Sequence, residues 1–214
     1  MTSTDTPEVG TTRRYHHGDL PNALRRAAAE VIVERGLGNF SLREVARRAG
    51  VSHTAPAHHF GDMQGLLTSL AAEGFTLLAD AMERAMEGVD DPVERLVRIG
   101  QVYVNFAGTN PAHFDVMFRE DVVDAEHESV TLAGTRAFDL LHQTVLRLLE
   151  AEQLDVPIDV ATSLFWSAVQ GLVALAPRLD HVCEVHAHLR RFQPHELVRD
   201  FVDLIVNGLR SHRA

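Results

Sequence analysis

Residues 41–60 decide the fold and read Ser-Leu-Arg-Glu-Val-Ala-Arg-Arg-Ala-Gly-Val-Ser-His-Thr-Ala-Pro-Ala-His-His-Phe. Ser41 and Glu44 have the S-x-x-E spacing of a capping box, in which each side chain satisfies a backbone N–H at the helix start. Gly50 stands where a helix end favours a residue that tolerates positive φ. Between them, apolar residues recur at helical spacing, at Leu42, Val45, Ala46 and Ala49. This pattern predicts a short helix that ends in a sharp turn.

A second short helix is expected after the turn, with Ser52 as its cap. Pro56 lies four residues after Ser52, so the carbonyl that its ring faces belongs to the non-helical cap. The clash that breaks a helix interior is therefore small here. The outward positions hold small or polar residues, namely Ser52, His53, Thr54, Ala57 and His58. In a helix-turn-helix, such a helix enters the DNA major groove. We therefore predict that Ser52, His53 and Thr54 face base edges. Arg43 and His58 are predicted to contact phosphates.

This region resembles a known family of DNA-binding domains. The resemblance rests on Leu42 to Ser52, His59-Phe60 and Leu66-Leu67, and on the opening Tyr15-His16-His17-Gly18-Asp19-Leu20. Over residues 15–80 the chain is similar to the TetR (tetracycline-repressor) family. That family usually carries a phosphate-contacting Tyr where this chain has Ala57, and a Lys where it has Met63. Both differences remove a contact to the DNA backbone.

The resemblance implies an all-α transcriptional regulator of about nine helices. An N-terminal three-helix domain (residues 15–60) is expected to bind DNA. A larger helical domain (residues 61–214) is expected to bind a small-molecule effector and to dimerise. The family usually represses transcription until a ligand binds. The implied partners are a palindromic operator, a second copy of the chain and an effector of unspecified identity.

Composition and charge agree with this assignment. The 214 residues are 45% hydrophobic and 23% charged, with a net charge of −10. Arginine is nevertheless in excess over acids in residues 1–60, which favours DNA contact there. A single Cys excludes an internal disulfide, and neither a signal peptide nor a membrane span is recognised, so a cytoplasmic protein is expected. Residues 1–14 are expected to form a disordered arm, in which Arg14 is a candidate DNA contact.

Helical periodicity and cap residues predict the remaining elements. The expected helices cover residues 20–35, 62–87, 91–108, 110–118, 130–152, 158–176 and 194–209. Pro177 is expected to end the 158–176 helix. That helix is apolar nearly all round, which predicts burial on several sides, and Gly171 within it suggests close approach by another helix. Leu132 and Phe138 are predicted to point inward in residues 130–152, and Leu204 in residues 194–209. The last two helices are predicted to form the dimer seam.

Aromatic and polar residues gather in the middle of the chain, as the lining of a small-molecule site would require. The candidate effector residues are Tyr103, Phe106, His113, Phe114, Met117, Phe138, His142, Trp166 and Gln170. Each is also compatible with an ordinary core position. No catalytic motif, paired carboxylate or phosphate loop is present, so neither an enzyme nor a cofactor is expected.

Two alternatives remain open from the sequence. Residues 181–188 contain three His, one Cys and one Glu, which would suit a metal- or pH-responsive regulator, but their spacing matches no standard metal site. The second alternative is a helical binding protein or enzyme that has lost DNA binding, because Ala57 and Met63 replace two backbone contacts.

Overall fold

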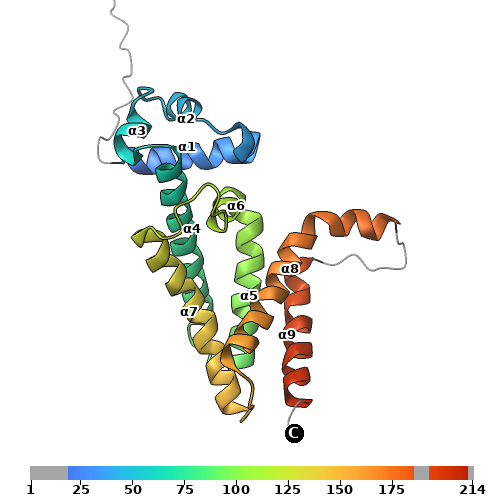
Figure 1. Ribbon diagram of the computed structural model, residues 1–214. Coiled ribbons are helices and arrows are strands. Elements are labelled where there is room, and N and C mark those ends of the chain that lie inside the picture. The colour runs from blue at the N-terminus through green and yellow to red at the C-terminus, as the bar shows by residue number, and fades with distance from the viewer. Residues whose placement is uncertain (1–18, 186–192, 212–214) are drawn as a thin grey trace, which may run out of the picture.

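The computed structural model describes residues 19–185 and 193–211, without the side chains of residues 179–185. Within these ranges the chain is all-α, as predicted, and no strand occurs. Its elements are α1 (Leu20–Arg35), η1 (Leu37–Asn39), α2 (Leu42–Ala49), α3 (Ala55–Phe60), α4 (Met63–Met86), α5 (Pro92–Thr109), α6 (Pro111–Met117), α7 (Glu128–Ala151), α8 (Ile158–Val185) and α9 (Pro194–Ser211). Figure 1 shows α1–α3 as a small head above a body formed by α5–α9, with α4 running from one into the other.

The head begins with the helices that the sequence predicts. α1 has the predicted bounds and buries its apolar stripe against α2 and α4. The Ser41 hydroxyl accepts the Glu44 N–H at 3.3 Å, and Gly50 ends α2 in the left-handed region at φ 68°. The second half of the predicted capping box is wrong, because the Glu44 carboxylate binds Arg47 and Arg35 instead of the Ser41 N–H. Pairing with two guanidinium groups replaces the single hydrogen bond from the backbone N–H.

α3 begins later than predicted. Its cap is Thr54, whereas Ser52 lies in the preceding turn with its hydroxyl 3.0 Å from that of Thr54. Pro56 consequently falls in the first turn of the helix, where no intrahelical N–H bond is lost. The later start fits proline better than the predicted start at Ser52.

α4 joins the head to the body. The Asp62 carboxylate caps it by accepting the Gly65 N–H at 2.9 Å, as the sequence indicates. Its 24 residues span about 36 Å at 1.5 Å per residue. One apolar cluster continues from α1 and α2 through Leu66 and Leu70 to Ala112 and Val116 on α6. The head therefore does not have a core of its own, and the predicted division between residues 60 and 61 crosses a continuous core.

The body is organised around α5 and α7. Asp91 caps α5 by accepting the Glu94 N–H at 3.0 Å, and Pro92 follows at the first helical position. α5 packs against α4, α7, α8 and α9. A second core cluster joins α5, α7, α8 and α9, and a third joins α4, α5 and α6. The helices of the body thus form one packed unit.

α8 differs from its prediction in two ways. It continues through Pro177 to Val185, since an interior proline can kink a helix without ending it. Part of its apolar surface is also uncovered: Val160, Leu164 and Leu175 are exposed, while Ala161, Phe165 and Leu172 are buried. No atom of the described chain outside the helix's own backbone lies within 4 Å of a Cβ built on Gly171, so the predicted close approach is absent within the protomer.

Two inward assignments are also wrong. The exposed fraction is 72% for Leu132 and 70% for Leu204. α9 instead buries Val198, Val202 and Val206, with Leu197, Phe201 and Ile205 partly buried beside them. A helix with apolar residues on more than one side does not reveal from sequence which side meets the core.

Candidate DNA-binding surface and effector cavity

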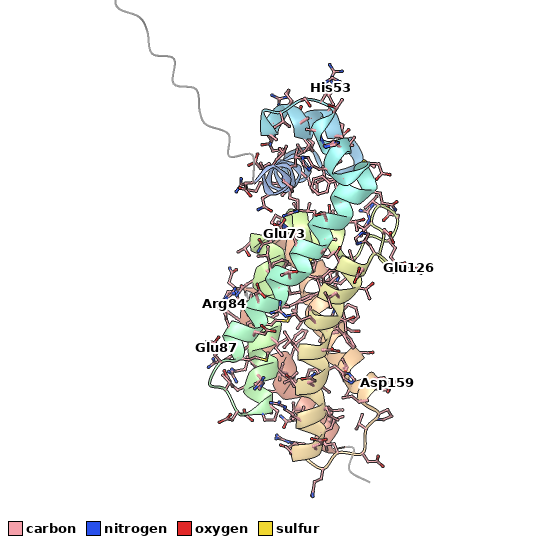
Figure 2. All side chains as sticks on the ribbon, turned by 90° about the vertical axis from the view of Figure 1, so that its left-hand side faces the viewer. His53, Glu73, Arg84, Glu87, Glu126 and Asp159 are labelled. Atoms are coloured by element: carbon pink, nitrogen blue, oxygen red, sulfur yellow. The ribbon has the colours of Figure 1, made fainter. Side chains whose placement is uncertain are left out.

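The predicted base-facing residues lie at the free end of the head. Ser52, His53, Thr54, Ala57 and His58 are all exposed. Figure 2 shows His53 at the tip of the molecule, at the opposite end from the body. The buried face of α3 is made by Pro56, with Phe60 partly buried beside it. The helix therefore presents small and polar side chains to an approaching surface.

Ion pairs distinguish the arginines of the head. Arg26 pairs with Asp19, Arg35 and Arg47 with Glu44, Arg48 with Glu34, and Arg25 with Glu73 of α4. Among the arginines in residues 19–60, Arg43 alone forms no ion pair, and its side chain is exposed on α2. Its guanidinium is thus available for a phosphate. Arg48 links α2 to Glu34 of α1, whereas Arg47 pairs with Glu44 within α2.

Glu44 is the centre of this charge network. Two Arg47 nitrogens donate to its carboxylate at 2.9 and 2.6 Å, and Arg35 lies at 3.0 Å. The hydrogen bonds from Arg47, helped by the charges of Arg35 and Arg48, lower the pKa of Glu44 to about 2. The carboxylate therefore stays ionised at physiological pH and fixes α2 against the end of α1.

The body contains a cavity of about 280 Å³ that is partly open to solvent. Residues of α4, α5, α7, α8 and α9 line it, together with Phe118 immediately after α6. Its walls are aliphatic and aromatic, and no described lining residue carries a charge. A concave apolar site with few polar groups is typical of small-molecule binding.

Tyr103 supplies the polar corner of this cavity. Its hydroxyl donates to Gln170 Oε1 at 2.5 Å and accepts from Trp166 Nε1 at 3.4 Å. Burial raises the pKa of Tyr103 to about 12, against a small opposing effect of the Trp166 hydrogen bond. The phenol is therefore neutral at physiological pH.

A polar junction connects head and body near this cavity. Glu73 on α4 binds Arg25 of α1 at 3.2 Å and faces His113 Nε2 of α6 at 3.3 Å. Arg25 also donates to Ser69 at 3.2 Å. In Figure 2, Glu73 lies along α4 at the level where the head meets the body. The hydrogen bond of His113, followed by the charge of Arg25, holds the pKa of Glu73 below its usual value.

Comparison with known families decides the identity of both parts. Residues 24–70 match the family described as "Bacterial regulatory proteins, tetR family". Residues 96–178 match the "Tetracyclin repressor-like, C-terminal domain". The chain belongs to the TetR family. It is a DNA-binding transcriptional regulator, and TetR-family regulators are not enzymes.

Solved structures share this TetR architecture. A protein of unknown function from Rhodococcus sp. RHA1 is 29% identical, with 92% of this chain and 98% of that one covered and a TM-score of 0.75. The TetR regulator PfmR from Thermus thermophilus is 22% identical, with coverage of 87% and 98% and a TM-score of 0.65. FadR from Bacillus subtilis, solved with stearoyl-CoA, is 14% identical, with the same coverage and a TM-score of 0.68. The last two show the fold alone.

The structure separates the predicted effector residues of this TetR protein into three groups. Tyr103, Phe138 and Trp166 line the cavity. Gln170 and His142 lie in a second layer, since Gln170 accepts from Tyr103 and the His142 ring stacks on Phe138 at 5.8 Å. The others pack in the core or at the head–body junction, and they are Phe106, His113, Phe114 and Met117.

Sequence reasoning missed most of the cavity wall. Phe165 and Phe201, from α8 and α9, and Gly134 and Ala137, from α7, line it. Their helical spacing marks them as inward residues, but spacing does not distinguish a cavity wall from a packed core. The wall becomes visible only when five helices are assembled.

Two predictions concern residues outside the described ranges. Arg14 lies before residue 19, and His186 and His188 lie within 186–192. The side chains of His181, Cys183 and Glu184 are likewise not described, although their backbone belongs to α8. Among the side chains that the structure describes, no group of three His, Cys, Asp or Glu residues is arranged to hold a metal ion.

Proposed function

We propose that the protein is a homodimeric TetR repressor. A small molecule in the body cavity weakens its binding to the operator and so relieves repression. One observation carries the proposal: an exposed, mostly small and polar recognition helix stands above a helical body that holds an apolar cavity and leaves one face of α8 exposed. The direction of regulation, repression relieved by ligand, comes from the family resemblance. A cytoplasmic location follows from the same proposal.

The uncovered surface of α8 supports a second copy as its partner. Val160, Leu164 and Leu175 are 56%, 44% and 53% exposed on this helix. The stretch Ile158–Arg178 is long and apolar enough to span a membrane by length and composition, yet TetR regulators are soluble proteins. Large exposed apolar patches on soluble proteins mark interaction sites. The open space beside Gly171 allows close approach of a partner helix.

The geometry of a dimer explains why a regulator would need an interface along the exposed face of α8. A two-fold dimer presents two copies of α3, and helix-turn-helix dimers bind half-sites about 34–36 Å apart or at multiples of that spacing. The symmetry of the protein then requires a palindromic operator. Ser52, His53 and Thr54 would contact base edges, and Arg43 and His58 would contact phosphates.

The cavity has a structural route to the head. Phe118 lines the cavity and follows α6 directly. α6 contributes Ala112 and Val116 to the apolar cluster that contains α1, and His113 to the Glu73 junction. A ligand shifts the arrangement of the heads only by its different affinity for the two states. The stearoyl-CoA bound by Bacillus subtilis FadR supports an effector role for a body of this fold.

A gel shift with DNA from upstream of the protein's own gene tests the proposal. We expect a discrete complex of one dimer per duplex, which disappears when excess unlabelled upstream DNA is added but persists with the same excess of unrelated DNA. Equal competition by the two DNAs would contradict operator recognition. It would favour the alternative that specific DNA binding has been lost with the Tyr and Lys that Ala57 and Met63 replace.

A further inference from the structure

We propose that the effector cavity selects a small, uncharged, apolar molecule and excludes carboxylates and coenzyme A thioesters. The inference rests on the proposed function, because it assigns a ligand class to the proposed effector site. It concerns ligand binding alone, so it is tested on the protein without DNA.

Among the residues that the structure describes, no charged side chain lines the cavity. The lining combines aliphatic side chains with aromatic rings, and Phe75, Tyr103, Phe118, Phe138, Phe165 and Trp166 are among the rings. The nearest cation on the α7 wall, Arg136, points its guanidinium to Asp80 at 2.7 Å and Glu83 at 2.5 Å on α4. Transferring an unpaired carboxylate from water into such surroundings is strongly unfavourable. A charged ligand would therefore lose more hydration free energy than it gains from contacts with the cavity wall.

The polar corner also fits a neutral ligand. The Tyr103 proton is already donated to Gln170, so the hydroxyl offers a ligand only its oxygen as an acceptor. A carboxylate or carbonyl oxygen only accepts hydrogen bonds, so it would face the Tyr103 oxygen with no proton available to join them. An alcohol or phenol would instead donate to it. His142 stacks behind Phe138 with its Nδ1 3.3 Å from Thr162 Oγ1 and is not part of the cavity wall.

The volume sets the size of the ligand. An apolar cavity of about 150 Å³ holds benzene, whereas this cavity measures about 280 Å³. By simple scaling it accommodates roughly ten or eleven non-hydrogen atoms. An eight-carbon alcohol or a two-ring phenol falls in this range. The nucleotide part of a coenzyme A thioester would have to remain outside.

Trp166 reports directly whether a ligand occupies the cavity. It is the only tryptophan in the chain and lines the cavity. Its ring lies 6.1 Å from Phe118 and 6.2 Å from Phe138. A molecule that enters the cavity therefore changes the surroundings of the one indole, and its emission spectrum reports binding without a label.

The test is to titrate the DNA-free dimer at pH 8 with 1-octanol, octanoate and octanoyl-CoA, following Trp166 emission and heat of binding. We expect 1-octanol to bind at least about tenfold more tightly than octanoate, since even a small residual charge penalty of about 1.4 kcal/mol has that effect. Octanoyl-CoA is expected to bind no better than octanoate. Equal or tighter binding of either charged compound would overturn the inference, as would failure of 1-octanol to bind.

A matched pair of variants shows whether the cavity is the site. Gly134 lines the cavity, and a Cβ there meets only the Phe75 ring at 3.9 Å, so Gly134→Leu fills the space without a backbone clash. Gly108→Leu makes the same change on the open surface of α5. We expect Gly134→Leu to lose 1-octanol binding and Gly108→Leu to keep it. Retention by Gly134→Leu would overturn the assignment. Binding of 1-octanol without any effect on DNA would uphold it and contradict only the proposed regulation.

Discussion

Individual residues of the head divide into those that hold it together and those left free for DNA. Glu44 collects Arg35 and Arg47, and Glu34 engages Arg48. Arg43, one helical position from Glu44, has no such partner and remains exposed. The sequence alone predicts an arginine-rich α2 but does not say which arginine is free, because the answer depends on carboxylates brought in by α1.

Replacing Arg43 tests this division. We expect Arg43→Ala to weaken binding to specific and random DNA by a similar factor and to reduce the slope of log affinity against log salt by about 1, as loss of one phosphate contact does. Thr54→Ala is expected to change the preference between sequences instead. Arg84→Ala, at the far end of α4 in Figure 2, controls for the loss of one positive charge. Fluorescence anisotropy at several salt concentrations measures all three, and equal behaviour of Arg43→Ala and Arg84→Ala would refute the contact.

The low pKa of Glu44 predicts a dependence of stability on pH. Since the pKa falls from about 4.3 in the unfolded chain to about 2 in the folded one, the ionised carboxylate stabilises the head above about pH 4. This contribution is lost as the pH falls from about 4 towards 2. We expect Glu44→Gln to be less stable than the wild type at pH 7 and the difference to shrink in that acid range. Urea unfolding at a series of pH values measures it, and a difference independent of pH would contradict the role of the charge.

Element boundaries followed the sequence where a polar cap fixes them locally. Asp62 and Asp91 cap α4 and α5 through bonds spanning three residues, and both starts are confirmed. Features that depend on packing between helices were not predicted correctly from the sequence. Pro177 lies within α8, and Leu132 and Leu204 face outward, because the facing helices decide which side of an apolar helix is covered.

The cavity lies beyond sequence reasoning for the same reason. Tyr103, Phe138 and Trp166 were predicted for the effector site and line the cavity, while Phe106 and Met117, of the same chemical type, pack in the core. Whether an aromatic residue fills space or borders it depends on the volumes of its neighbours. Gly134 and Ala137, which leave the space open, carry no signal of that role in the sequence.

The uncovered face of α8 predicts the dimer seam at the level of the element. Leu175→Glu places a charge on that face and should weaken dimerisation by at least about tenfold, or about 1.4 kcal/mol. Leu132→Glu is the matched control, because Leu132 is also exposed but lies on α7. Sedimentation velocity across a range of concentrations measures the dimer dissociation constant. A wild-type monomer, or equal weakening by both variants, would show that the seam lies elsewhere.

At the scale of the whole molecule, the acidic body and the arginine-bearing head have separate tasks. The chain carries a net charge of −10, yet residues 1–60 hold more arginines than acids. Repulsion between the body and DNA leaves the heads as the only favourable point of contact. Under the proposed function, affinity depends on how the body spaces two heads, and a ligand near α6 would change that spacing through the junction of Arg25, Glu73 and His113.

Selection of bound fragments from a random pool of duplex DNA, at a fixed salt concentration, tests the central claim most directly. The wild-type dimer should enrich inverted repeats whose half-sites are separated by about one helical turn or a multiple of it. Leu175→Glu, which lacks the seam, should enrich isolated half-sites weakly or not at all. A pool that stays unenriched with the wild-type dimer would contradict the account.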